Sequence, residues 1–201
     1  MTRGDIPATL QAEGLKVGAE LGVQNGDFAA HTLRVWTACE RYYLVDLWGH
    51  QANYEDLANV NDDEQERRYQ QTQANLQPWK EKTVFLRNYT VEAAKQIPDG
   101  SLDYIYVDAR HDYCGVMEDL ETYWPKLRRG GILAGHDYLA AQDPSVKDSN
   151  QDWSLCMNGT RNEGAVKGAV DEFALKHGLQ ILNRNIGTTA EDGAEGTVAD
   201  F

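Results

Sequence analysis

Acidic residues and a histidine stand where several short apolar runs of this chain come to an end. Asp46 follows one run, Asp108 follows another, His136 and Asp137 follow a third, and Glu20 lies near the end of an earlier one. If these runs are parallel strands, their carboxyl ends meet at one edge of a sheet, where ligands bind in open α/β folds. We therefore expect these side chains to converge on one ligand site.

Two glycines after the first run indicate what kind of ligand this site takes. Gly22 and Gly26 frame a short turn, and glycine there lets the backbone approach a ligand closely. Asp46 ends the next run, where a carboxylate can accept both hydroxyl hydrogens of a ribose diol. The pair predicts a nucleoside site. The turn lacks the Gly-x-Gly-x-x-Gly pattern and the chain has no Gly-Lys-Ser/Thr, which disfavours NAD and nucleoside triphosphates.

The elements that must position these residues alternate between apolar runs and helical patterns. This alternation predicts an α/β fold: a Rossmann-like, doubly wound, mostly parallel sheet with helices on both faces. Residues 138–162 show no period, so we expect a long loop that shapes a pocket together with the polar segment 51–82. The expected strands are 15–21, 42–45, 83–86, 102–107, 132–134 and 179–182, with 187–201 as an antiparallel edge strand or a frayed tail. The expected helices are 28–39, one within 51–82, 91–97, 113–127 and 166–177.

Composition limits the class of protein and the kind of partner. The 201 residues are enough for one domain spanning 1–201. Nineteen Lys and Arg against 32 Asp and Glu give a net charge of −13, which disfavours nucleic acid and anionic membranes and favours a small-molecule partner. With no long apolar run and no apolar signal region, we expect a cytoplasmic protein. Cys39, Cys114 and Cys156 are expected to be reduced, because they are odd in number and widely spaced.

Four stretches of the chain resemble class I S-adenosylmethionine-dependent methyltransferases, and more narrowly a branch of small O-methyltransferases related to macrocin and catechol O-methyltransferases. The first stretch carries an acidic residue followed by spaced glycines, with Gln24 at the position of the middle glycine. The resemblance covers roughly residues 15 to 182 and implies S-adenosylmethionine as cofactor. The four stretches are Ala19–Phe28, Tyr43–Trp48, Tyr106–Tyr113 and Gly130–Tyr138.

The resemblance also implies which residues bind the cofactor. Glu20 would orient the glycine loop, Asp46 would hold the ribose, and Leu47 and Trp48 would lie against the adenine. Thr90 matches a small polar residue that reaches the adenine region. The full set implied is Glu20, Gly22, Gln24, Asn25, Gly26, Asp46, Leu47, Trp48 and Thr90.

In the metal-dependent members of this branch, a carboxylate after the fourth strand and two ligands after the fifth bind Mg²⁺, which implies Asp108, His136 and Asp137. A basic residue three positions after the fourth-strand Asp is the general base of the catechol type, and that position is His111. Asp108 and His111 are thus the implied catalytic residues, and a histidine pKa near 6–7 suits proton abstraction. The resemblance implies methyl transfer to a small hydroxylated acceptor, and a homodimer stays open.

Two rival functions remain at this point. His111, Asp108 and either His136 or Asp137 could form the facial triad of an Fe(II) hydroxylase or oxygenase, although a nucleoside pocket has no role in that chemistry. A non-catalytic module that keeps the cofactor pocket is the second rival. Binding of S-adenosylmethionine separates the oxygenase from the other two, and turnover separates the enzyme from the module.

Overall fold

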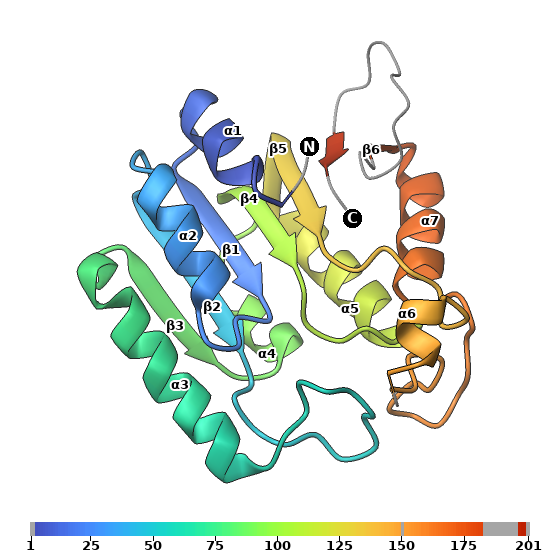
Figure 1. The fold of residues 1–201 in the computed structure, drawn as a ribbon. Helices are drawn as coiled ribbons and strands as arrows, with labels where there is room; N and C mark the ends of the chain where they lie inside the picture. The colour runs from blue at the N-terminus through green and yellow to red at the C-terminus, as the bar shows by residue number, and fades with distance from the viewer. Residues whose placement is uncertain (1–2, 150, 183–196, 200–201) are drawn as a thin grey trace.

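The chain folds around a seven-stranded sheet in the order β3-β2-β1-β4-β5-β7-β6. Figure 1 shows its strands from β3 to β5 side by side. This computed structural model describes residues 3–149, 151–182 and 197–199. Every pair of neighbouring strands is parallel. The strands are β1 (Val17–Leu21), β2 (Arg41–Asp46), β3 (Thr83–Arg87), β4 (Leu102–Val107), β5 (Leu127–Gly135), β6 (Gln180–Leu182) and β7 (Thr197–Ala199).

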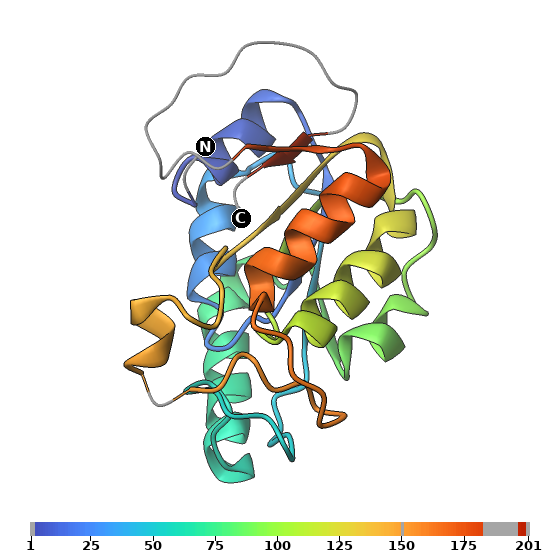
Figure 2. The same ribbon diagram turned by 90° about the vertical axis from the view of Figure 1, so that its right-hand side faces the viewer.

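Side chains alternate between the two faces of the sheet and build a hydrophobic core on each. In β2, Tyr42 and Leu44 belong to one core, and Tyr43 and Val45 to the other. Helices cover both faces, so the expected Rossmann-like α/β class is confirmed (Figures 1 and 2). The first core packs against α1 (Ile6–Ala12), α2 (Asp27–Val35) and α3 (Asp62–Leu76). The second packs against α4 (Thr90–Ala94), α5 (Tyr113–Tyr123), α6 (Pro144–Lys147) and α7 (Ala165–His177).

The end of α5 departs from the sequence pattern. Apolar spacing predicts a helix that continues to Leu127, but α5 ends at Tyr123 and a single 3-10 turn follows. Pro125 explains the difference, because proline has no N–H to donate and its ring clashes with the preceding turn. The predicted helix end at Leu127 is therefore wrong, since Leu127 is the first residue of β5.

The C-terminal tail also differs from expectation where the structure describes it. β7 pairs in parallel with both β5 and β6, so it lies inside the sheet and is not an antiparallel edge strand. The rest of the predicted segment, 187–196 and 200–201, lies outside the described residues. Helix α1 was not predicted. Within the described parts of the chain, no helix combines the length and apolarity needed to cross a membrane.

Backbone hydrogen bonds extend the sheet by one residue at its carboxyl edge. Gly22 N–H donates to the Val45 carbonyl at 2.9 Å, Asp108 N–H to that of Leu21 at 2.8 Å, and His136 N–H to that of Val107 at 3.1 Å. The sheet thus fixes the backbone of Gly22, Asp108 and His136 along one edge.

Candidate functional site

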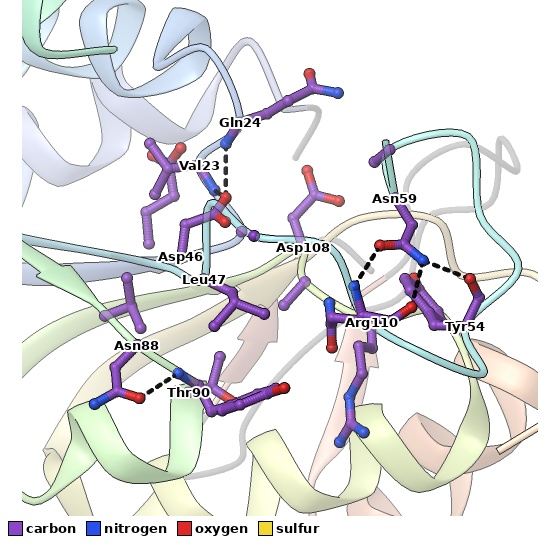
Figure 3. Close-up of a pocket in the computed structure, with 18 of the residues that line it drawn as sticks. Val23, Gln24, Asp46, Leu47, Tyr54, Asn59, Asn88, Thr90, Asp108 and Arg110 are labelled. Carbon is purple, nitrogen blue, oxygen red and sulfur yellow. Dashed lines mark hydrogen bonds between the residues drawn. The ribbon is translucent and has the colours of Figure 1, made fainter. Parts of the chain in front are cut away.

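A cavity of about 570 Å³ opens at this edge of the sheet. It brings together eight of the residues that the sequence singled out, and Figure 3 shows several of them. Five other residues that the sequence singled out lie outside the wall of this cavity: Asn25, Gly26, Trp48, His136 and Asp137. The eight are Glu20, Gly22, Gln24, Asp46, Leu47, Thr90, Asp108 and His111.

The glycine loop after β1 has left-handed backbone conformations at every second residue. The φ angles are +85° at Gly22, +52° at Gln24 and +75° at Gly26. A Cβ atom on Gly22 would lie 1.9 Å from the carbonyl oxygen of Asp108, so only glycine fits there. Gln24 has a left-handed backbone conformation, which glycine adopts most easily. This agrees with its position at the middle glycine of the motif. The loop therefore runs directly against the end of β4.

Asp46 holds this loop through its carboxylate (Figure 3). One oxygen accepts hydrogen bonds from the backbone N–H groups of Val23 at 2.8 Å and Gln24 at 2.9 Å. The other accepts from the N–H of Trp48 at 2.8 Å. Burial raises the pKa of Asp46, and these three bonds oppose that effect. Because a carboxylate offers about four acceptor positions, room remains for about one further bond rather than two ribose hydroxyls.

Trp48 does not lie where the sequence placed it. Its side chain is buried, its indole N–H donates to the Gln24 carbonyl at 2.8 Å, and its ring packs on Tyr69 with centroids 4.8 Å apart. Trp48 is therefore not part of the cavity wall, whereas its neighbour Leu47 lines the cavity. Trp48 instead stabilises the glycine loop through its hydrogen bond to the Gln24 carbonyl.

Asn25 and Gly26 also serve the loop from outside the cavity. The Asn25 carbonyl accepts from the Asn75 side chain on α3 at 2.8 Å. Gly26 is the N-cap of α2, and a Cβ there would lie 2.8 Å from the Thr72 methyl group. Both residues therefore fix the loop against the helices α2 and α3.

Glu20 lies deep in the cavity wall below the loop. Its side chain is 1% exposed, and one carboxyl oxygen accepts from the Tyr42 hydroxyl at 2.7 Å. Burial raises the pKa of Glu20 to about 8, the Tyr42 bond and the charge of Arg3 oppose the rise, and nearby Asp108 and Asp46 add to it. Glu20 is thus mostly an uncharged acid at neutral pH.

Thr90 lines the cavity, but its hydroxyl points to a buried partner. It donates to Asp119 on α5, and the Tyr123 hydroxyl donates to the Thr90 carbonyl at 2.9 Å. Asp119 is fully buried, and burial raises its pKa to about 7. Sequence reasoning missed Asp119, although an acidic residue three positions after the core residue Val116 was a usable signal.

A second group of side chains gathers beyond β4 and β5. Asp108, His111 and Asp137 each offer a ligand atom, and these atoms lie within 4.8 Å of one another. His111 Nε2 is 3.6 Å from an Asp108 oxygen and 3.4 Å from an Asp137 oxygen, and it is buried with no hydrogen-bond partner. The expected set contained His136, but its Nδ1 bonds Asp137 at 3.0 Å and is outside this group. The group thus contains His111 together with two of the three expected ligands, Asp108 and Asp137.

The surroundings of His111 determine its charge. Its Nδ1 lies 2.8 Å from an Asp56 oxygen, and its ring stacks on Trp153 with centroids 4.4 Å apart. Burial alone would lower the pKa of His111, but Asp108 and Asp56 outweigh it and raise the pKa to about 10. This pKa is higher than the expected 6–7, because carboxylates surround the ring.

The segment 151–162 lies beside His111, where Trp153 stacks on the histidine ring, and a disulfide links the segment to α5. Cys156 is bonded to Cys114 at the start of α5, with Cα atoms 5.7 Å apart. The expectation of reduced cysteines is wrong for this pair, while Cys39 is free and buried. The two cysteines are 42 residues apart, and the irregular loop that brings them together has no sequence period. Met157 on the same segment lines the cavity.

Arg3 is a cavity residue that sequence reasoning missed. Its guanidinium lies 3.5 Å from an Asp108 oxygen and 4.4 Å from the centre of the Phe28 ring. No spacing pattern near the N-terminus marked it. It brings a positive charge to the Glu20 and Asp108 side of the cavity.

Comparisons with known proteins agree on the fold and on a family. Residues 19–138 match the family described as a methyltransferase domain. The O-methyltransferase from Bacillus cereus in complex with SAH has a similar structure, with a TM-score of 0.58 and 14% identity, over 88% of this chain and 68% of that one. An O-methyltransferase family protein from Burkholderia thailandensis gives a TM-score of 0.55 at 14% identity, over 92% of this chain and 52% of that one.

A curated relative adds little about function. This is the uncharacterized protein y4gI of Sinorhizobium fredii, which is 35% identical over 69 residues. The match covers 34% of this chain and only 8% of that protein, so it spans less than a tenth of this relative's length.

Proposed function

Because the chain belongs to the family described as a methyltransferase domain, we propose that it is an S-adenosylmethionine-dependent O-methyltransferase acting on a small hydroxylated molecule. One observation supports this most strongly. A single cavity runs from the glycine loop, held by Asp46, to Asp108 and His111. The first end suits a nucleoside, and the second suits an oxygen that must lose a proton.

The cofactor would lie along the glycine loop. Asp46 keeps about one acceptor position for a ribose hydroxyl, and Leu47 offers an apolar surface for the adenine. The sulfonium group of S-adenosylmethionine is a cation, and the carboxyl groups of Glu20 and Asp108 line the same cavity. The protein's contribution to the rate would be to align the acceptor oxygen with the methyl carbon.

A divalent cation fits the group formed by Asp108, His111 and Asp137. The two carboxylates supply the oxygen ligands that Mg²⁺ and Mn²⁺ prefer, and the buried Nε2 of His111 lacks any other partner. Bound there, the cation would lower the pKa of the acceptor hydroxyl and stabilise the oxyanion. Asp108 and Asp137 would hold it, and His111 would complete the set.

His111 therefore suits the role of a ligand better than that of a general base. Its Nδ1 is engaged by Asp56, and its Nε2 faces Asp108 and Asp137. The same geometry disfavours the iron oxygenase, because that chemistry uses two histidines and one carboxylate. The group found among the described residues holds one histidine and two carboxylates.

Calorimetry with the purified chain tests the cofactor site. We expect heat with S-adenosylhomocysteine and none with NAD. Asp46→Ala removes three bonds to the loop and the ribose acceptor, and should weaken binding by about 1–3 kcal/mol, roughly 5- to 150-fold. Asp99→Ala is the matched control, because Asp99 is exposed and precedes β4 at the opposite edge of the sheet. No heat with S-adenosylhomocysteine would refute the proposal.

Turnover tests the reaction. Labelled S-adenosylmethionine and a panel of hydroxylated small molecules should give methylated product, with activity lost in chelator and restored by Mg²⁺. Cofactor binding with no transfer to any acceptor would favour the non-catalytic module. Full activity in excess chelator would remove the cation from the mechanism and leave the methyltransferase in place.

A further inference from the structure

We propose that Asp56 is a positioning residue that orients His111 toward a divalent cation held by Asp108 and Asp137. This inference rests on the proposed function, since it concerns the cation at that same site. Asp56 lies in the polar segment between β2 and α3, 55 residues before His111. No motif of the sequence pointed to it.

The contact between Asp56 and His111 is close and buried. An Asp56 oxygen lies 2.8 Å from His111 Nδ1, and the two side chains are only 3% and 13% exposed. The other Asp56 oxygen accepts from the Ala58 N–H at 2.7 Å, which fixes the carboxylate. Asp56 therefore presents a fixed carboxylate oxygen to the Nδ1 atom of His111.

The contact between the Asp56 carboxylate and Nδ1 determines which ring nitrogen of His111 can bind a cation. The carboxylate accepts hydrogen bonds and donates none, so His111 must keep its proton on Nδ1. In the neutral ring, the lone pair then belongs to Nε2, the atom that faces Asp108 and Asp137. Metal-binding histidines commonly donate their second N–H to a carboxylate in this way, which fixes both tautomer and ring orientation.

Neighbouring side chains clamp the ring from other sides. Trp153 stacks on its face at an interplanar angle of 26°. The Tyr54 hydroxyl accepts from the His111 backbone N–H at 3.1 Å. With Asp56 at the ring edge, these contacts leave Nε2 as the one nitrogen of the ring that is directed at the two carboxylates.

The segment that carries Asp56 is itself held in place. The Asn59 amide donates to the Gln51 and Tyr54 carbonyls at 2.8 and 2.6 Å. The Ala58 carbonyl accepts from Gln65 on α3 at 2.9 Å. Such bonds give the segment the rigidity that a positioning residue requires.

The test measures Mn²⁺ affinity by calorimetry, with electron paramagnetic resonance of free Mn²⁺ as a second readout. We expect Asp56→Ala to weaken Mn²⁺ binding by roughly 10- to 100-fold while S-adenosylhomocysteine affinity stays unchanged. Asp56→Asn keeps an oxygen that can accept from Nδ1–H and should recover part of the loss. Asp63→Ala is the matched control, because Asp63 is an exposed carboxylate in the first turn of α3. In turnover, kcat should fall while the KM for S-adenosylmethionine holds.

A His111→Ala background separates positioning from a general structural effect. If Asp56 acts through His111, Asp56→Ala should cause no further loss of Mn²⁺ affinity there. An equal loss in both backgrounds would overturn the proposal, as would a folded Asp56→Ala chain that binds Mn²⁺ like the wild type. Wild-type protein that binds S-adenosylhomocysteine but no Mn²⁺ would also overturn it, and would leave the methyltransferase proposal intact.

Discussion

Replacing Glu20 by Gln should change how the stability of this chain depends on pH. Gln has nearly the same shape and can still accept from the Tyr42 hydroxyl, so the substitution removes ionisation and little else. The pKa of Glu20 is about 8 in the folded chain against 4.5 as its ordinary value. The folded state therefore keeps a proton that the unfolded state releases, and stability falls as pH rises from 4.5 to 8.

The magnitude follows from the size of the shift. Between about pH 5.5 and 8.5, the wild type should lose about 3 kcal/mol relative to Glu20→Gln, from about 2.5 units at 1.36 kcal/mol each. Burial of the carboxyl leaves little solvent to screen this effect. Urea unfolding of both proteins, followed by tryptophan fluorescence at several pH values, measures the difference. Parallel stability curves from pH 5.5 to 8.5 would refute the assignment of a raised pKa to Glu20.

Three further substitutions and a reduction experiment test other parts of the site. Gly22→Ala should abolish S-adenosylhomocysteine binding in calorimetry, because its Cβ meets the Asp108 carbonyl and its left-handed backbone alone costs about 1–2 kcal/mol. Gln24→Gly, the matched change in the same loop, should keep binding and gain up to about 1 kcal/mol in urea unfolding; lost binding would show that the Gln24 side chain contacts the cofactor. Cys156→Ser opens a loop of 42 residues and should cost about 4 kcal/mol. Dithiothreitol should bring the wild type to the same urea midpoint, and an unchanged midpoint would contradict the disulfide.

The strands and their ends could be predicted because their signal is local. β4 has the bounds that its apolar run predicts. Parallel pairing then places Asp46 and Asp108 at one edge whatever the connecting segments do. The prediction succeeds here because the register between parallel strands places the residues that follow each strand at the same edge of the sheet.

Side-chain direction could not be predicted beyond the strand ends. Trp48 and Asp137 have φ angles of +41° and +58°, so the chain turns sharply at both and strand alternation no longer applies. Trp48 consequently lies outside the cavity wall. Asp137 directs a carboxylate oxygen toward His111, so His111 and not His136 belongs to the group of candidate ligands. Motif spacing specifies a position along the chain and carries no information about such left-handed turns.

Contacts between residues far apart in the sequence could not be predicted, for a different reason. Asp56 meets His111, and Cys114 meets Cys156, through segments with no helical or strand period. Their paths depend on individual side-chain bonds, such as those of Asn59 to the backbone of its own loop. A pattern of residue types cannot specify contacts that depend on the path of an irregular loop.

The charged groups of the site are related to its proposed function. Carboxyl groups from Glu20, Asp108 and Asp137 approach one edge of a chain with a net charge of −13, and like charges at short range favour binding of protons or other cations. Burial keeps a proton on Glu20, with help from Asp108, and the carboxylates around His111 keep a proton on its ring. A sulfonium cofactor and a divalent cation are both cations that can take over this role. Carboxyl groups gathered at this edge would thus suit the cavity to the methyl transfer that we propose.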